Sequence, residues 1–224
     1  MSNVTPRAYV FDAYGTLFDV HAAIARHREA AGPDAERFSE LWRLKQLEYS
    51  WTLTLAGQYV DFGTLTQRAL DYALARVPSV DRALRPRLLE AYQKLDAYPD
   101  ARDAVAALKA RGLSTAILSN GAPAMLKSAV EASGMAPILD AVLSVDAVRM
   151  YKPRPEVYGL VTDRFALRPE EIVFVSSNRW DVMGAAAFGF RALWVNRAGM
   201  PDEYADHPPL RVVPDLSVIT SMEF

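Results

Sequence analysis

The sequence predicts an α/β protein, in which a Rossmann-like parallel sheet is interrupted by one all-helical insertion. After residue 98, short apolar runs alternate with segments of helical period, which is typical of βαβ units. A separate apolar run at residues 8–11 lies far ahead of them and must join the same sheet, because a lone strand has no partner. The stretch between residues 20 and 97 shows helical patterns only.

Glycine and proline divide the chain into its expected elements. Strands are expected at residues 8–11, 115–118, 141–145, 172–175, 191–195 and 211–213. The core helices are expected at residues 101–111, 123–133, 155–165 and 181–188. Within the insertion, helices are expected at residues 21–31, 34–55, 63–76 and 81–95. We therefore predict a catalytic core of residues 1–19 and 98–224 and a helical subdomain of residues 20–97.

The composition excludes several classes of protein. A net charge of −2 with scattered arginines gives no nucleic-acid surface, and the absence of cysteine excludes disulfides, thiolate metal sites and a cysteine nucleophile. No apolar run approaches the roughly 18 residues that a membrane span needs, and the start of the chain lacks the apolar core of a signal peptide. We therefore expect a cytoplasmic location. His21, His27 and His207 belong to no motif and are expected to be surface residues.

Polar side chains follow several of the predicted strands at the points where they end. Asp12 follows the first strand, Ser119 and Asn120 the second, and Ser176 begins a polar stretch that reaches Asp181. Asp12 by itself could be a helix cap. The carboxyl ends of parallel strands share one edge, however, so these groups are expected to converge there together with Lys152. A lysine near Asp12 would keep that carboxylate ionised.

Four segments in this order and spacing resemble the motifs of the haloacid dehalogenase superfamily. They are residues 11–19, 118–121, 151–153 and 175–181. The resemblance covers essentially the whole chain, and the helical insertion looks like the cap of that superfamily. Residues 41–49 and 176–181 are most similar to the 2-haloacid dehalogenases that act on the (S), or L, isomer. The resemblance implies the haloacid dehalogenase fold.

Two departures separate this sequence from the phosphatases of the same superfamily. Tyr14 stands where those enzymes have a second aspartate, which protonates an oxygen leaving group, and Ser176–Ser177 replaces the Gly-Asp that helps to hold magnesium. A departing halide needs no general acid. The sequence therefore predicts no metal and no cofactor. A magnesium-dependent phosphatase and a non-catalytic binding protein of the same fold remain as alternatives.

The resemblance implies a two-step hydrolysis of a short (S)-2-haloalkanoic acid to an (R)-2-hydroxy acid. Asp12 would attack C2, displace halide and form an ester, which water then cleaves. The implied catalytic residues are Asp12, Lys152, Asp181, Asn178 and Ser176. Ser119 would bind the substrate carboxylate, while Arg43 and Asn120 would receive the halide. The implied substrate-binding set is Ser119, Asn120, Arg43, Tyr14, Thr16, Tyr158, Phe62 and Trp180.

Simpler roles compete for some of these residues. Arg43 could be a solvated residue of an amphipathic helix, Phe62 and Trp180 could be ordinary core, and Asp181 could cap a helix. Thr16 could be a turn residue and Tyr158 could simply pack against the core. Arg179 has no assigned role and is expected at the surface. The aromatic residues of the cap, Trp42, Tyr49 and Trp51, predict a homodimer contact, with a small 2-haloacid, water and halide as the other partners.

Overall fold

The computed structural model describes residues 4–222, within which six parallel strands form one sheet in the order β3-β2-β1-β4-β5-β6. The strands are β1 (Ala8–Phe11), β2 (Ser114–Ser119), β3 (Ala141–Ser144), β4 (Ile172–Ser176), β5 (Arg191–Val195) and β6 (Arg211–Val213). The predicted α/β class is confirmed. Each strand lies within one or two residues of its predicted bounds. β1 is paired on both sides, with β2 and with β4, which places the residue after it at the middle of the sheet.

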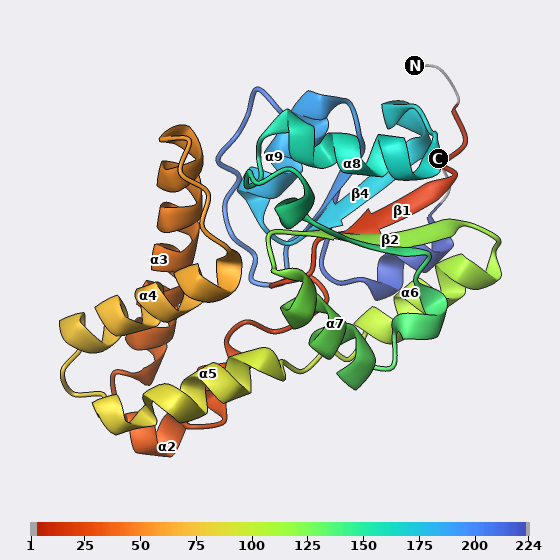
Figure 1. Cartoon of the computed structure of the whole chain (residues 1–224). Coiled ribbons are helices and arrows are strands. Elements are labelled where there is room, and N and C mark those ends of the chain that lie inside the picture. Colours follow the sequence, from red (N-terminus) through yellow and green to blue (C-terminus); the bar gives the residue numbers. More distant parts are fainter. Residues whose placement is uncertain (1–3, 223–224) are drawn as a thin grey trace.

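Helices cover both faces of the sheet (Figure 1). α8 (Pro155–Phe165) and α9 (Arg179–Phe188) lie on one face, and α6 (Ala101–Ala110) and α7 (Pro123–Ala132) lie on the other. The pleat of β1 divides its side chains between two apolar clusters, with Tyr9 and Phe11 on the α6 and α7 side and Val10 on the α8 and α9 side. Burial on both faces explains why β1 is apolar throughout.

Helices alone occupy the chain between β1 and α6, apart from isolated bridges. They are α1 (Ala22–Ala25), α2 (Arg28–Ala31), α3 (Ala35–Leu55), α4 (Phe62–Arg76) and α5 (Arg85–Gln93), with a 3₁₀ turn at Arg82–Leu84. The single helix predicted at residues 21–31 is wrong. Its backbone leaves the helical region at His27, with φ −118° and ψ 19°, where the amide donates to the Ile24 carbonyl over only three residues.

The buried face of α3 is not the one that the spacing of its apolar residues suggests. Leu41, Leu44, Trp51 and Leu55 fall near helical spacing after Phe38, but Leu44 is 54% exposed and Leu55 is 85% exposed. The buried residues of α3 are Ala35, Phe38, Ser39, Trp42, Gln46 and Ser50. Polar residues replace the leucines inside because they find hydrogen-bond partners there, and a pattern of hydrophobicity does not record such partners.

The strands point toward the helical segment, as the arrowheads of β1 and β4 show in Figure 1. The carboxyl ends of the strands therefore face helices α3, α4 and α5, and one apolar cluster continues from Phe11 through Tyr14 to Trp42 and Tyr92. The division into a core of residues 1–19 and 98–224 and a cap of residues 20–97 stays a prediction. Residues 1–3 and 223–224 of that core lie outside the described residues.

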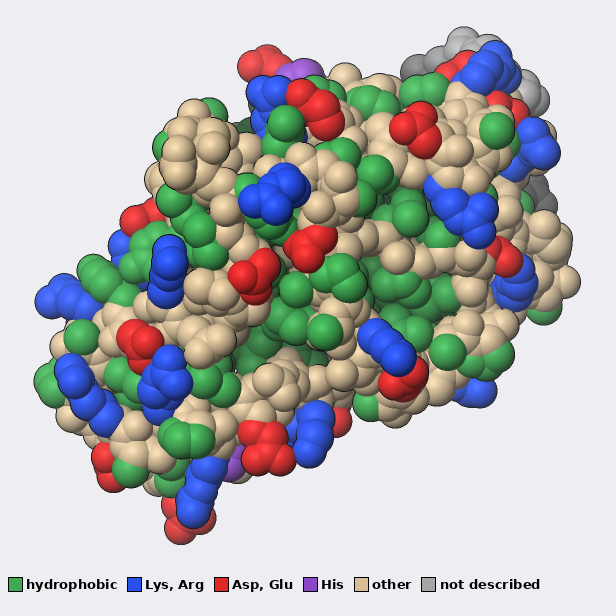
Figure 2. All heavy atoms as spheres, in the orientation of Figure 1, with side chains coloured by type: hydrophobic (Ala, Val, Ile, Leu, Met, Phe, Trp, Pro, Cys, Tyr) green, Lys and Arg blue, Asp and Glu red, His purple; other side chains and the backbone are tan. Residues whose placement is uncertain are grey.

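The surface carries both signs of charge. On the face shown in Figure 2, Lys and Arg side chains alternate with Asp and Glu, and hydrophobic side chains gather in the hollow between the two ends of the molecule. This mixture agrees with the net charge of −2. None of the helices formed by residues 4–222 is both long and apolar enough to cross a membrane.

Candidate active site

Asp12 lies directly after β1, at the middle of the sheet edge, and is only 6% exposed. Its backbone amide donates to the Val175 carbonyl at 2.9 Å, which extends the pairing of β1 with β4 by one residue. Three donors hold its carboxylate. Lys152 Nζ lies 3.1 Å from Oδ1, while Asn178 Nδ2 and Thr16 Oγ1 lie 2.8 Å and 3.2 Å from Oδ2. Two of these donors, Lys152 and Asn178, lie far from Asp12 in the sequence, as the convergence of strand ends predicted.

Lys152 bridges two buried carboxylates. Its Nζ also lies 2.8 Å from Asp181 Oδ2, and the side chains of Lys152 and Asp181 are fully inaccessible to solvent. Burial by itself lowers the pKa of Lys152, but Asp12 and Asp181 together outweigh this effect and raise that pKa above its ordinary value. The ammonium group is therefore charged. It compensates two acids that could not both remain ionised side by side without it.

Asp181 is held from the other side by Tyr158. The Tyr158 hydroxyl donates to Asp181 Oδ1 at 2.8 Å. Burial raises the pKa of Asp181 to about 6, although Lys152 opposes the shift, and the charge of Asp12 adds to it. Gly184 permits the close approach of Tyr158, because a Cβ at Gly184 would lie 2.5 Å from the Tyr158 hydroxyl and from Pro153. The glycine is a packing requirement that the sequence did not reveal by itself.

The loop after β4 is tied to the loop after β1. Asn178 Nδ2 donates to the Tyr14 carbonyl at 3.1 Å as well as to Asp12, and the amide of Ser177 donates to Thr16 Oγ1 at 2.8 Å. Ser176 is fully buried, and its Oγ accepts the Asn178 amide at 3.1 Å. These contacts fix the orientation of Asn178, so that its amide group meets Asp12 instead of capping α9.

Ser119 and Asn120 end β2 beside Asp12. Both are buried, and Ser119 Oγ accepts the Gly121 amide at 3.0 Å. Asn120 Oδ1 accepts the backbone amide of Lys152 at 3.1 Å, so the amino group of Asn120 remains as the donor of that side chain. A Cβ at Gly121 would lie 2.6 Å from the Tyr14 ring, so only glycine allows Tyr14 to lie across this loop.

The helical segment contributes a cation and an apolar wall. Arg43 on α3 is half-buried, and its Nη2 lies 3.4 Å from the Tyr14 carbonyl, so the arginine faces the site and not the solvent. The Tyr14 ring packs against Phe62 of α4 and Tyr92 of α5, with centroid distances of 5.9 Å in both cases. Burial raises the pKa of Tyr14, which keeps its hydroxyl protonated. Tyr92 was not predicted as a site residue, since one tyrosine on a helical face looks like core.

Trp180 lies apart from this inner group. It is half-buried at the start of α9 and packs edge-on against Trp51 of α3, with ring centroids 5.4 Å apart. Both residues line a pocket of about 330 Å³, together with Lys152, Pro153, Met183 and Tyr204. Trp180 thus shares a cavity with Lys152. Its role as a wall for the substrate stays a prediction.

Arg179 is not a surface residue, and that expectation is wrong. It is only 4% exposed, and its Nε donates to Asp202 at 2.6 Å. Its Nη2 donates to the carbonyls of Tyr204 and His207 at 2.8 Å and 2.9 Å. The long segment between β5 and β6 folds back over the start of α9 and buries the guanidinium, and local sequence gives no signal of such a return.

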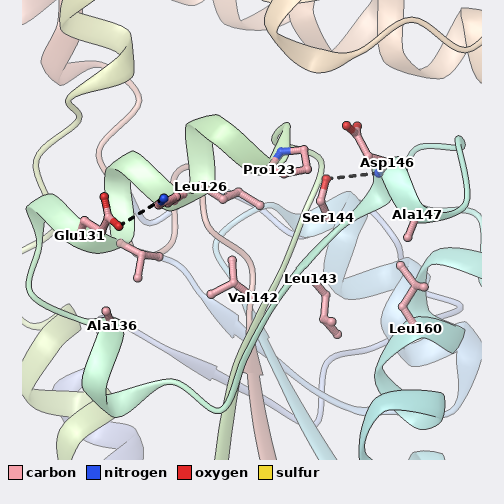
Figure 3. A pocket seen from close by; sticks show the side chains of 12 residues that line it. Pro123, Leu126, Glu131, Ala136, Val142, Leu143, Ser144, Asp146, Ala147 and Leu160 are labelled. Carbon is pink, nitrogen blue, oxygen red and sulfur yellow. Dashed lines mark hydrogen bonds and ion pairs between the residues drawn. The ribbon is translucent and has the colours of Figure 1, made fainter.

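The larger hollow seen in Figure 3 contains none of the predicted site residues. This groove of about 710 Å³ lies between α7, β3 and α8 and is lined mainly by apolar side chains such as Leu126, Val142 and Leu160. Its charged lining residues are Lys127, Glu131 and Asp146, and the first two form a loose ion pair at 3.9 Å. The groove offers no buried acid, base or nucleophile. The buried acids of residues 4–222, Asp12 and Asp181, lie instead at the carboxyl edge of the sheet.

The side chains around the Asp12 carboxylate are hydrogen-bond donors, which do not coordinate a divalent metal. Among residues 4–222, no three His, Cys, Asp or Glu side chains gather as a metal-binding group. Magnesium requires a near-octahedral set of oxygens. Lys152 Nζ instead lies between the two carboxylates at 3.1 Å and 2.8 Å, and the other neighbours of Asp12 are donors. These residues do not fit a magnesium ion.

Fold and site together define an α/β protein with a buried carboxylate–lysine–carboxylate centre at the edge of a parallel sheet, beneath a helical segment. Residues 6–189 match the model of the haloacid dehalogenase-like hydrolase family. The (S)-2-haloacid dehalogenase 1 of Pseudomonas sp. (strain CBS-3) is 49% identical over 217 residues, which cover 96% of each chain. The (S)-2-haloacid dehalogenase 4A of Burkholderia cepacia is also 49% identical, over 94% of this chain and 92% of that protein.

A solved structure of a 2-haloacid dehalogenase is also similar to this chain. The L-2-haloacid dehalogenase of Xanthobacter autotrophicus with chloropropionic acid covalently bound superposes with a TM-score of 0.88. It is 38% identical and covers 96% of this chain and 97% of its own. The chain belongs to the haloacid dehalogenase-like hydrolase family, and the resemblance read from its four motifs is confirmed.

Proposed function

We propose that the protein hydrolyses short (S)-2-haloalkanoic acids to (R)-2-hydroxy acids through an ester on Asp12. The observation that carries the proposal is the Asp12 carboxylate, paired with Lys152 at 3.1 Å and oriented by Asn178 at 2.8 Å, with Tyr14 where a phosphatase has the acid that protonates a leaving oxygen. The 49% identity with an (S)-2-haloacid dehalogenase over nearly the whole chain supports the same activity.

The first step forms the ester. An oxygen of Asp12 attacks C2 of the substrate from the side opposite the halogen, a carbon–oxygen bond forms, and halide leaves with the electrons of the carbon–halogen bond. Ser119 with nearby backbone amides would bind the substrate carboxylate. Arg43 and the amino group of Asn120 would receive the halide, because donors and a cation stabilise the charge that develops on it. Tyr14, Phe62 and Trp180 would contact the apolar part of the substrate.

The second step hydrolyses the ester. Water attacks the carbonyl carbon of the Asp12 side chain, the bond between that carbon and the oxygen attached to C2 breaks, and this oxygen leaves with C2 and takes up a proton to give the 2-hydroxy acid. The bond at C2 itself is not broken in this step, so that the configuration at C2 is inverted only once. Asp181 would accept a proton from this water, a role that suits an acid whose pKa is raised by burial to about 6. Asn178 and Ser176 would hold the water, Thr16 and Tyr158 would fix Asp12 and Asp181, and Lys152 would balance the charge.

We also propose that the reaction needs no metal. The alternative, a magnesium-dependent phosphatase, would require a carboxylate ligand where Ser177 stands and an acid where Tyr14 stands. The test compares two assays of the purified protein. We expect halide release from 2-chloropropionate that continues in EDTA, and no magnesium-dependent release of phosphate from phosphate esters. Phosphate release that depends on magnesium, with no halide release, would favour the phosphatase.

Trapping the intermediate tests the nucleophile. Rapid quenching with substrate, followed by digestion and mass spectrometry, should find the propionate adduct on the peptide that contains Asp12. Asp12→Asn should retain the fold and lose turnover by about three orders of magnitude or more, as nucleophile replacements do. Full activity in that variant would exclude the mechanism. Assays with each pure enantiomer, and chiral analysis of the product, test the expected inversion.

We also propose a homodimer, but the apolar surface that supports it differs from the one predicted from the sequence. Trp42, one of the three aromatic residues behind the prediction, is 3% exposed and packs inside the chain against Phe38 and Tyr92. Leu44 and Leu55 of α3 are exposed and offer apolar surface instead. Light scattering at increasing concentration tests the proposal, because association depends on concentration. The cytoplasmic location also stays a prediction.

A further inference from the structure

We propose that Tyr92 is a positioning residue for Arg43, and that a buried, uncharged chain of side chains across three helices fixes the orientation of the Tyr92 hydroxyl. The inference rests on the proposed function, because Arg43 matters there as the cation that receives the halide. Tyr92 would not touch the substrate. It would act by holding the guanidinium in place.

The chain of hydrogen bonds joins α5, α3 and α4. The Tyr92 hydroxyl donates to Gln46 Oε1 at 3.3 Å, and Gln46 Nε2 donates to Thr66 Oγ1 at 2.9 Å. Thr66 also accepts the indole N–H of Trp42 at its carbonyl, at 3.0 Å. Tyr92, Gln46 and Thr66 are 3%, 1% and 3% exposed, so water does not compete for these bonds.

The chemistry of the amide sets the direction of the chain. Gln46 has one accepting oxygen and one donating amino group, and the amino group is committed to Thr66. The oxygen therefore faces Tyr92, and the Tyr92 hydrogen points toward Gln46. The lone pairs of the Tyr92 oxygen are left for a donor from elsewhere. Arg43, whose side chain carries donors only, lies one turn before Gln46 on the same face of α3, which places its guanidinium on the side of that oxygen.

Tyr14 provides the second point of attachment. Arg43 Nη2 donates to the Tyr14 carbonyl at 3.4 Å, which is a long bond and a weak restraint by itself. The Tyr92 ring stacks on the Tyr14 ring, with centroids 5.9 Å apart and planes 15° from parallel. The Tyr14 carbonyl in turn accepts from Asn178, which holds Asp12. Tyr92 and Tyr14 thus hold Arg43 in a fixed position relative to Asp12.

Electrostatics agree with this placement. Burial raises the pKa of Tyr92, and the charge of Arg43 and the hydrogen bond between Tyr92 and Gln46 oppose the rise. A phenylalanine at this position would pack against Trp42 and Tyr14 without the cost of burying a hydroxyl. The hydroxyl is therefore explained by its two polar neighbours. With one donor of Arg43 on the Tyr14 carbonyl and, in this proposal, a second on the Tyr92 oxygen, its remaining donors can point to the departing halide.

Two variants separate positioning from support of the fold. Tyr92→Phe and Gln46→Met both break the bond between Tyr92 and Gln46, but only Tyr92→Phe removes the oxygen that faces Arg43. We expect similar decreases of the melting temperature. In kcat/KM for 2-chloropropionate, we expect a loss of about tenfold for Tyr92→Phe, the worth of one hydrogen bond to a charged group, and a clearly smaller loss for Gln46→Met.

A double-mutant cycle with Arg43→Lys completes the test, with 2-bromopropionate as the substrate because its better leaving group keeps slow variants measurable. Tyr92→Phe should have little further effect when Arg43 is already replaced. Equal losses in Tyr92→Phe and Gln46→Met, or an undiminished effect of Tyr92→Phe beside Arg43→Lys, would show that Tyr92 only supports the fold. Absence of halide release from the unmodified protein would instead overturn the proposed function.

Discussion

Two buried polar networks lie on either side of Tyr14, and they differ in charge. On the core side, Lys152 joins the carboxylates of Asp12 and Asp181. On the other side, the network of Gln46, Thr66 and Tyr92 is neutral. Burying charge is costly and makes a network sensitive to pH, whereas neutral groups can orient a neighbour without titrating. Of these two networks, only the one that holds Asp12 buries charge.

The largest effect is expected when the centre of the charged network is removed. Lys152→Met leaves two carboxylates buried against each other, so we expect a loss of about 3–5 kcal/mol in the free energy of unfolding. Turnover should fall by about a thousandfold or more, since Asp12 loses its counter-charge. Urea unfolding and halide release measure both effects. Lys109→Met, which removes a partly exposed pair with Asp140, is the matched control and should cost less than about 1 kcal/mol.

The dependence on pH should separate the two networks. Since burial raises the pKa of Asp181 to about 6, turnover should rise about tenfold between one unit below and one unit above that value, as the base ionises. Asp181→Asn should abolish this rise together with most of the activity. If Asp181→Asn kept the same rise, another group would be the base.

The same pKa has a consequence for stability of opposite sign. The folded protein binds the Asp181 proton more tightly than the unfolded chain, whose carboxyl has its ordinary value of 3.8. The stabilising contribution of Asp181 is therefore complete below that value and is lost as pH rises through about 6. The difference between the unfolding free energies of the unmodified protein and of Asp181→Asn, measured from pH 4 to pH 7, should change in this direction.

A smaller effect is expected when one hydrogen bond of the charged network is removed. Tyr158→Phe deletes the donor to Asp181 Oδ1, which opposes the effect of burial on the pKa of that acid. The pKa should rise further, by about 0.7 of a unit for a bond worth about 1 kcal/mol, and the rise of turnover should move to higher pH. Tyr92→Phe, the matching change in the neutral network, should leave the position of that rise unchanged. If the rise of turnover moved to higher pH in both variants, the two networks would not act independently.

The smallest effect is expected for an exposed pair on the same helices. Asp71 and Arg85 join α4 to α5 with distances of 2.5 Å and 3.0 Å, but both side chains are more than one third exposed. Asp71→Asn should change the free energy of unfolding by less than about 1 kcal/mol and leave halide release unaltered. A large loss of activity here would show that any disturbance of the helical segment reaches the site, which would weaken the argument from Tyr92.

Local signals in the sequence were sufficient for much of the fold. The strands and most helices were predicted because apolar runs, glycines and prolines mark them, and Asp12, Lys152 and Asp181 were brought together by the rule that parallel strands end at one edge. Prediction failed where partners are distant in the sequence. Arg179 is buried by a loop that returns more than twenty residues later, and Gln46 is buried because Thr66 and Tyr92 satisfy it.

The sequence by itself determined the class of fold, the order of its elements and the acid after β1, because periodicity and turn residues act over short distances. The absence of an acid at Tyr14 was also readable, and it separates this chain from the phosphatase pattern. Only the tertiary structure decided that one ammonium group lies between Asp12 and Asp181. It also decided which face of α3 turns inward, since that depends on hydrogen bonds between helices that periodicity does not encode.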